Sequence, residues 1–194
     1  MINGKKVSAI IPARGGSKRL KGKNIFPVLG KPMICYAIEA CQKSDYVDEI
    51  IVSSDCEKIE SVVKNFKNVI FHSRSESLSD DKTFKQDVIV EVLRSVYENS
   101  KEEKPKTILS VQANSPEISD KIIDEMIETK LKFNKKEIFS VDKDLMQNGA
   151  VRVMDYEYCF LKTLSMYCGV YICDLHDVHT IKDVEIVEKR MSRK

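Results

Sequence analysis

The chain contains 194 residues, carries a formal net charge of +2 at pH 7, and is 42% hydrophobic. This length predicts one domain, spanning residues 1–194, that can bury a full hydrophobic core. The nearly balanced charge argues against bulk nucleic-acid binding, and no apolar run approaches the length of a membrane span, so we expect neither a nucleic-acid nor a membrane partner.

The cysteines and the first residues indicate the compartment. No C-x-x-C pair occurs among the six cysteines, which stand at positions 35, 41, 56, 159, 168 and 173. We therefore expect buried free thiols in a reducing environment rather than a zinc site. The opening residues, M-I-N-G-K-K, lack the apolar core of a signal peptide. These features predict a cytoplasmic protein.

The first expected element is a strand that opens into a basic loop. An apolar run, 7–11, ends at Pro12, and Gly15 and Gly16 follow among five cations: Arg14, Lys18, Arg19, Lys21 and Lys23. Adjacent glycines allow a ligand to approach bare peptide N–H groups, which can form a concave anion site. Neither the P-loop spacing nor the dinucleotide fingerprint is present. The stretch predicts a binding site for a polyphosphate.

Strands and helices alternate along the rest of the chain. Further strands are expected over 49–53, 69–71, 107–111, 138–141, 149–154 and 170–173. Helices are expected over 33–43, 57–65, 83–97, 120–133 and 181–191. The expected helix-start signals are Pro32, Asp55, Asp80 or Asp81, Ser119, and the capping-box pair Thr180 and Asp183.

This alternation predicts an α/β fold with a mostly parallel sheet covered by helices on both faces. Ligands in such sheets bind beyond the carboxyl ends of the strands. The basic loop, residues 53–55 and residues 112–116 each follow an expected strand. We therefore expect these loops to meet at one site.

The sequence I-P-A-R-G-G-S-K followed by G-K-N-I resembles the N-terminal signature of the cytidylyltransferases that activate acidic sugars. These are the CMP-sialic acid synthetases, with the CMP-Kdo synthetases as more distant relatives. The resemblance implies a three-layer Rossmann-like nucleotidyltransferase fold, CTP as a substrate, and Mg²⁺ as the cofactor. It assigns catalysis to Arg14, Lys18 and Lys23, and nucleotide contacts in this loop to Ala13, Arg14, Gly15, Gly16, Ser17, Lys18 and Lys23. Arg19 and Lys21 match the family less well, and we expect them to be solvated.

Two later stretches are similar to nucleotide-contacting segments of the same family. H-S-R-S-E-S-L, at 72–78, resembles the family's R-P-x-x-L, so Arg74 is expected to reach the nucleotide. Asp80 and Thr83 follow, as residues near the base and ribose or, equally, as a helix cap. Q-A-N-S-P, at 112–116, resembles Q-P-T-S-P. The resemblance gives Gln112 a base or ribose contact, and it puts Asn114 where the Kdo enzymes hold metal with an aspartate.

The acceptor and metal positions come last in the chain. Asn148, Gly149 and Ala150 form the family's N-G-A, which lies beside the acceptor. Asp177 and His179 stand in the family's D-x-D-T, where both aspartates help to hold Mg²⁺. Asp177 is therefore the expected metal ligand. His179 is a poor ligand for magnesium, and it is expected to act as a phosphate donor, as a general acid or base, or to have no role.

The segment before N-G-A is shortened to residues 142–147, where the acidic-sugar enzymes have a long acceptor-side insertion. This omission predicts a small phosphorylated acceptor. The chain as a whole is similar to short members of this group that convert L-glutamine phosphate and CTP to CDP-L-glutamine for capsular phosphoramidate. The alternatives are a CMP-sugar synthetase for a sialic acid-like or Kdo-like sugar, and a nucleotide-binding regulator. The oligomeric state is left open, with a homodimer as one expectation.

Overall fold

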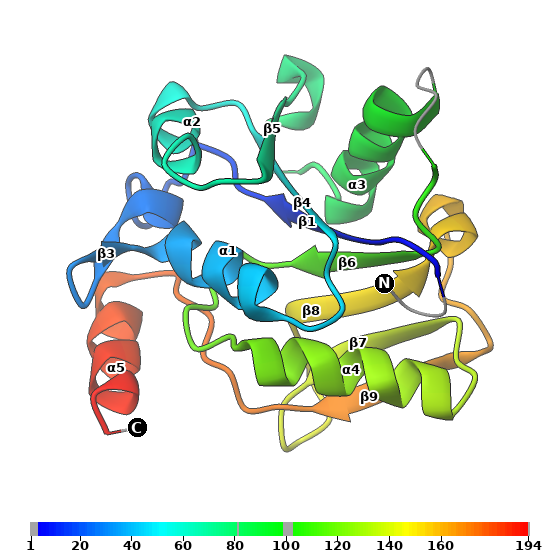
Figure 1. Ribbon diagram of the computed structural model, residues 1–194. Coiled ribbons are helices and arrows are strands. Elements are labelled where there is room, and N and C mark those ends of the chain that lie inside the picture. The colour runs from blue at the N-terminus through cyan, green and yellow to red at the C-terminus, as the bar shows by residue number, and fades with distance from the viewer. Residues whose placement is uncertain (1–3, 81, 99–102, 194) are drawn as a thin grey trace.

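The computed structural model describes residues 4–80, 82–98 and 103–193. Its centre is a seven-stranded sheet in the order β5-β4-β1-β6-β8-β7-β9 (Figure 1). The strands are β1 Val7–Pro12, β4 Glu49–Ser54, β5 Val69–Ser73, β6 Thr107–Val111, β7 Glu137–Val141, β8 Gln147–Asp155 and β9 Cys168–Ile172. A separate two-stranded hairpin joins β2 Pro27–Val28 to β3 Lys31–Pro32.

The sheet is mostly parallel, as the alternation of elements predicts. Strand β8 runs antiparallel to both of its neighbours, β6 and β7, and the remaining neighbours in the described sheet are parallel. β1 and β6 therefore end on the same side of the molecule, where α5 also lies (Figure 1). This side contains the loops that the sequence assigns to the ligand.

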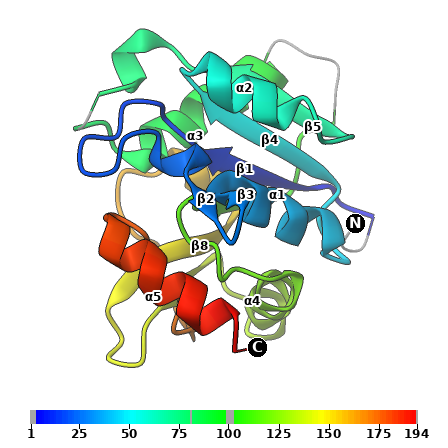
Figure 2. The ribbon, with the colours of Figure 1, turned by 90° about the vertical axis from the view of Figure 1, so that its left-hand side faces the viewer.

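Helices cover both faces of the sheet. They are α1 Met33–Lys43, α2 Glu57–Val63, α3 Lys85–Leu93, α4 Asp120–Lys132 and α5 Ile181–Met191. Alternate residues of β1 separate the two cores, because successive side chains of a strand point to opposite faces. Ala9 and Ile11 pack with residues of α1, α2 and α4, whereas Ile10 packs with residues of α3. Figure 2 shows α1 and α3 on opposite sides of β1.

Several helix starts differ from the sequence predictions. Asp55 does not cap α2, because its carboxylate accepts a hydrogen bond from the Gly15 N–H instead. The expected helix over 83–97 begins only at Lys85 and continues beyond Leu93 as a π-turn, Arg94–Glu98. Asp80 closes the preceding turn rather than capping α3, and Asp81 lies outside the described residues. The caps at Ser119 and Thr180 form as predicted.

Helix α5 is attached to the basic loop and the β2–β3 hairpin by a small separate core. Its buried members are Leu20, Val28, Met33, Val178, Val184 and Val187. Glu188 of α5 also accepts a hydrogen bond from the Leu29 N–H in the hairpin turn. The chain segment before α5 is thereby held beside the basic loop, about 160 residues earlier in sequence.

Within the described residues, no helix combines the length and apolar character that crossing a bilayer requires. The six cysteines are free thiols, as expected from their spacing.

Candidate functional site

A pocket at the carboxyl ends of the parallel strands gathers side chains from distant parts of the sequence. Six of the predicted nucleotide-site residues line it: Arg14, Ser17, Lys23, Arg74, Asp80 and Thr83. Asn24 and Lys85 complete its polar lining. The fold therefore brings together the basic loop, the loop after β5 and the start of α3, and the roles of these residues remain predictions.

The glycines of the basic loop act differently from the expectation of a bare N–H cradle. The Gly15 N–H donates to Asp55 Oδ1 at 2.7 Å, and the Ser17 N–H donates to the Gly15 carbonyl at 3.0 Å. Neither Gly15 nor Gly16 has a positive φ. A Cβ on Gly15 would lie 2.7 Å from the Cys56 Cβ, so glycine is required there by close packing. Part of the expected cradle is thus occupied by the protein itself.

Other loop residues divide between core and surface. Ala13 is fully buried in the core, and its N–H donates to the Ser53 carbonyl at 2.9 Å. Asn24 donates to the Arg14 carbonyl at 2.9 Å and fixes the base of the loop. Lys18 is exposed and is not among the residues that line the pocket.

The loop after β5 is organised by its own hydrogen bonds. Arg74 is buried, and its guanidinium donates to the Ser53 carbonyl at 2.7 Å. Asp80 Oδ1 accepts bonds from the Lys82 N–H, and from the N–H and hydroxyl of Thr83 at 2.7 and 2.6 Å. Since the guanidinium has five N–H donors, this bond leaves Arg74 with further donors on the pocket side.

Asp177 is held in place by the loop that follows β6. Its Oδ2 accepts a hydrogen bond from Gln112 Nε2 at 3.1 Å, and its Oδ1 accepts one from the Ser115 hydroxyl. Gln112 also donates to the Asn148 carbonyl at 3.2 Å. The Gln112 amide nitrogen therefore positions the Asp177 carboxylate and the backbone at Asn148. Sequence reasoning did not single out Ser115, although its place in Q-A-N-S-P is a usable signal.

Asn114 connects the loop after β6 to the segment before α5. It is buried, its side chain donates to the Val178 carbonyl at 3.1 Å, and its carbonyl accepts from the Val178 N–H at 2.9 Å. Asn114 thus fixes the segment between Asp177 and His179 through its amide nitrogen, and its expected role toward the ligand stays a prediction.

The N-G-A residues form the edge of the site on β8. Asn148 is engaged by Ser140, by the Ala150 N–H and by the Cys173 carbonyl, so its side chain stabilises the strand ends. Gly149 has a φ of +69°, and a Cβ there would lie 2.8 Å from Gln112 Nε2. The positive φ favours glycine there, and any side chain would also displace the end of Gln112. Ala150 is fully buried.

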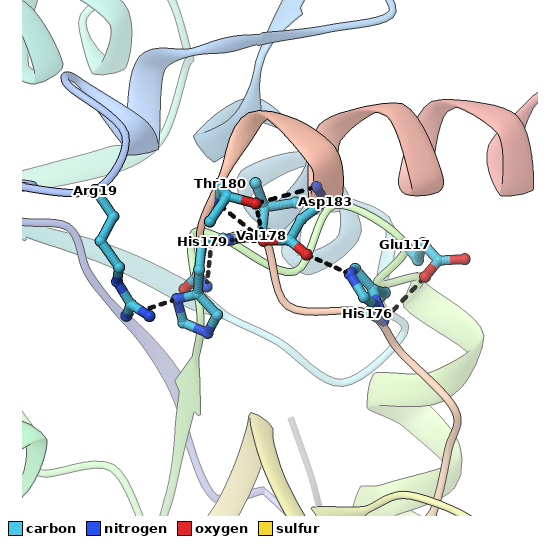
Figure 3. A network of polar contacts seen from close by, with 8 residues as sticks. Arg19, Glu117, His176, Val178, His179, Thr180 and Asp183 are labelled. Carbon is cyan, nitrogen blue, oxygen red and sulfur yellow. Dashed lines mark hydrogen bonds and ion pairs between the residues drawn. The ribbon is translucent and has the colours of Figure 1, made fainter.

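His179 lies opposite the basic loop and contacts Arg19 (Figure 3). The Arg19 Nη2 is 3.3 Å from His179 Nδ1. Because a guanidinium can only donate, Nδ1 accepts this bond. Burial lowers the pKa of His179, and the cations Lys23 and Arg19 lower it further. Arg19, expected to be solvated, is exposed yet held by this neutral imidazole.

A capping box orients the same segment from the other side. Asp183 Oδ2 accepts bonds from the N–H groups of His179 and Thr180 at 3.0 and 2.7 Å, and its Oδ1 contacts His176 Nε2 at 3.0 Å (Figure 3). The first turn of α5 therefore determines the direction of the His179 backbone.

The pocket is strongly electropositive. Burial lowers the pKa of Lys23, Asp177 opposes this shift, and Arg19 and Arg14 lower it further. Burial also lowers the pKa of Lys85 to about 8, against Asp177 and together with Arg152 and Lys23. Four cations, Arg14, Lys23, Arg74 and Lys85, outnumber the nearby carboxylates Asp80 and Asp177, and this excess favours a polyanionic ligand. Lys85 was not predicted as a site residue, because its sequence position near the expected start of a helix carries no other signal.

The donor set fits magnesium bound together with a substrate. Within the described ranges, no group of three or more His, Cys, Asp or Glu side chains could hold a metal ion. Mg²⁺ commonly takes one or two protein carboxylates and completes its shell with phosphate oxygens and water. Asp177, which lies near Lys23 and Lys85, fits that pattern.

A parallel sheet with a cation-lined pocket beyond its strand ends is typical of phosphate-binding α/β proteins. The chain belongs to the cytidylyltransferase family, whose model matches residues 8–165. It is 50% identical over 72 residues to the pseudaminic acid cytidylyltransferase of Campylobacter jejuni strain 81-176, which is 37% of this chain and 31% of that protein. It is 34% identical over 122 residues to the 3-deoxy-manno-octulosonate cytidylyltransferase of Geotalea uraniireducens, which is 63% of this chain and 44% of that protein.

The matched segments thus span less than half the length of these curated relatives. Among solved structures, a CMP:2-keto-3-deoxy-manno-octonic acid synthetase complexed with CTP superimposes with a TM-score of 0.74 at 17% identity, covering 97% of this chain and 99% of the other. The 4-diphosphocytidyl-2C-methyl-D-erythritol synthase of Anaerococcus prevotii gives 0.71 at 15% identity, covering 98% and 100%. These likenesses show the nucleotidyltransferase fold.

Proposed function

We propose that this protein is a cytidylyltransferase that transfers CMP from CTP to a small phosphorylated acceptor and releases pyrophosphate. The observation that carries the proposal is the clustering of Arg14, Lys23 and Arg74 in one pocket beside Asp177, in a chain of the cytidylyltransferase family. A polyanionic ligand would offset the mutual repulsion of these cations.

The chemistry is an in-line displacement at the α-phosphorus of CTP. An acceptor oxygen forms a new bond to this phosphorus as the bond to the β-phosphate oxygen breaks, and that oxygen leaves with the bonding electrons as part of pyrophosphate. The protein contributes by positioning both anions and stabilising the leaving charge. Arg14 and Lys23 are the residues proposed for that task. Mg²⁺, held by Asp177 and phosphate oxygens, would supply further neutralisation of the triphosphate charge.

An ionised phosphoryl acceptor makes a general base unnecessary. The second pKa of a phosphate group lies near 6, so its oxygens are already anionic at neutral pH. This fits the environment of His179, which accepts a hydrogen bond from Arg19. We assign His179 the task of orienting Arg19 toward the phosphates rather than removing a proton.

The connection between β7 and β8 supports a small acceptor. It is a tight turn in which Asp142 N–H donates to the Met146 carbonyl at 2.9 Å, and Asp142 Oδ1 accepts from the Asp144 and Met146 N–H groups. This compact turn contributes no arm to the acceptor side. L-glutamine phosphate, giving CDP-L-glutamine for modification of a capsular polysaccharide, is the proposed acceptor.

The second candidate is a CMP-sugar synthetase that acts on a sialic acid-like or Kdo-like acid. The names of the curated relatives favour it, since they specify pseudaminic acid and 3-deoxy-manno-octulosonate. Under either candidate the nucleotide pocket is the same, and only the acceptor differs.

The test is an acceptor panel with CTP and Mg²⁺, read by mass spectrometry of the products. Incubation with L-glutamine phosphate is expected to yield CDP-L-glutamine, while N-acetylneuraminic acid and Kdo yield no CMP-sugar. A CMP-sugar as the sole product would favour the second candidate. Absence of every product, with CTP still bound, would indicate a nucleotide-binding regulator and would contradict the proposed activity.

A further inference from the structure

Lys85 is the first residue of α3 and lines the same pocket as Arg14 and Lys23. A cation in the first turn of a helix opposes the helix dipole, which favours negative charge at that end. Lys85 therefore does not stabilise its own helix by its charge. Its position calls for an explanation outside helix stability.

The contacts of Lys85 lie on the β8 side of the pocket. Its Nζ donates to the Gly149 carbonyl at 3.2 Å, and a Cβ on Gly149 would lie 3.5 Å from this nitrogen. Gln112, the residue after β6, approaches the same glycine. Lys85 thus belongs to the end of the site formed by the N-G-A residues, whereas Arg14 and Lys23 belong to the loop after β1.

The Lys85 ammonium has no carboxylate partner within ion-pair distance in the part of the chain that the structure describes. Its only described hydrogen bond is to a backbone carbonyl, so at least one of its three donors points elsewhere. Lys85 is exposed on one side, yet the surrounding protein disfavours its charge: desolvation lowers its pKa, Asp177 opposes that shift, and Arg152 and Lys23 lower the pKa further. A bound anion at this position would relieve that imbalance.

We propose that Lys85 binds the anionic phosphoryl group of the acceptor and holds it beside the α-phosphorus of CTP. This inference rests on the proposed function and specifies the acceptor class as a molecule with an ionised phosphoryl group. Lys85 is the cation that binds the acceptor, and the cations of the basic loop bind the triphosphate. The carbonyl of Gly149 keeps the ammonium at the acceptor end between turnovers.

The experiment compares Lys85→Ala and Lys85→Arg with Lys121→Ala. Lys121 is a matched control, because it also lies in the first turn of a helix, α4, and is likewise exposed, but it lies outside the pocket lining and pairs with Glu125 of its own helix. Lys85→Ala is expected to raise the KM for L-glutamine phosphate by roughly 10- to 100-fold, the effect of losing one charge-assisted hydrogen bond. The Kd for CTP should stay within a few-fold of wild type. Lys85→Arg should recover part of the loss, and Lys121→Ala should change neither value.

The thermal midpoint separates binding from folding. Lys85→Ala should melt at the wild-type temperature or slightly higher, because a cation is removed from a helix N-terminus. A variant with weakened CTP binding and an unchanged acceptor KM would overturn the proposal, since Lys85 would then serve the triphosphate. Unchanged values for both substrates would also overturn it.

A binding measurement separates this inference from the proposed activity. L-glutamine phosphate is titrated by calorimetry into the protein saturated with a non-hydrolysable CTP analogue, and N-acetylneuraminic acid is titrated in parallel. Binding of the phosphoryl compound to wild type but not to Lys85→Ala supports the inference even if no product forms. Binding that depends on Lys85 only for the sugar acid, or binding of the phosphoryl compound that ignores Lys85, contradicts it.

Discussion

Lys21 and Lys23 stand two positions apart in the basic loop, but their environments differ. Lys23 lines the pocket and is partly buried among cations, whereas Lys21 is exposed and lies outside that lining. Removing a cation that stabilises developing charge typically costs on the order of 10²–10³ in rate. We expect Lys23→Ala to lose that much turnover in a pyrophosphate-release assay, and Lys21→Ala to stay within a few-fold of wild type. Equal effects of the two changes would show that the pocket is wrongly assigned.

Substitution of Asp177 tests its proposed role as the magnesium ligand. Asp177→Asn keeps an oxygen for the Ser115 hydroxyl but removes the negative charge. We expect most turnover to be lost at every Mg²⁺ concentration, while binding of CTP without metal remains largely intact, since the carboxylate meets the phosphates only through the ion. Calorimetry with and without Mg²⁺, beside turnover across a Mg²⁺ titration, provides the measurement. Normal turnover throughout that titration would place the metal elsewhere.

The lowered pKa of Lys85 predicts that the KM for the acceptor depends on pH. Its pKa of about 8 means that the ammonium is present below this pH and is lost above it. The charges facing it are Asp177, which raises its pKa, and Arg152 and Lys23, which lower it. The KM for the acceptor at saturating CTP should therefore rise with pH above about 8. Lys85→Arg, whose guanidinium stays charged, should flatten this rise, and an identical rise in both proteins would contradict the assignment.

At the scale of elements, the cap of α5 both stabilises this helix and orients part of the site. Thr180 and Asp183 cap its first turn and also hold the His179 backbone, whereas Ser119 caps α4 away from the pocket. Thr180→Ala and Ser119→Ala should each lower the free energy of unfolding by about 1 kcal/mol. Turnover should fall several-fold only in Thr180→Ala. Denaturant unfolding and pyrophosphate release test this pair, and equal turnover in both variants would remove the link between α5 and the site.

The helices and strands with strong local signals could be predicted from the sequence. The capping box at Thr180 and the apolar run that became β1 need no distant contacts to be recognised. The start of α3 could not be predicted, because Asp80 is a good capping residue in isolation. The folded chain uses it to close the turn at Thr83, and the helix begins at Lys85 without a side-chain cap. Asp55 was misassigned for the same reason, since its competing partner is the N–H of Gly15, 40 residues away.

At the scale of the whole molecule, the alternation of elements predicted the mostly parallel sheet and the convergence of its loops. The reversed direction of β8 was not foreseen, because an antiparallel strand carries no distinct local pattern. The pairing of Arg19 with His179 spans 160 residues and depends on α5 packing against Leu20. Contacts of this kind follow from tertiary packing, so the basic loop was predictable as a site while its inner geometry was not.

The central claim is that the pocket binds CTP and splits it between its α- and β-phosphates. The most direct measurement is pyrophosphate release with L-glutamine phosphate and Mg²⁺, run side by side with CTP, UTP, ATP and GTP. We expect sustained, acceptor-dependent release with CTP and much slower release with the two purine nucleotides. Faster release with a purine nucleotide, or no release from CTP when CTP is bound, would contradict it.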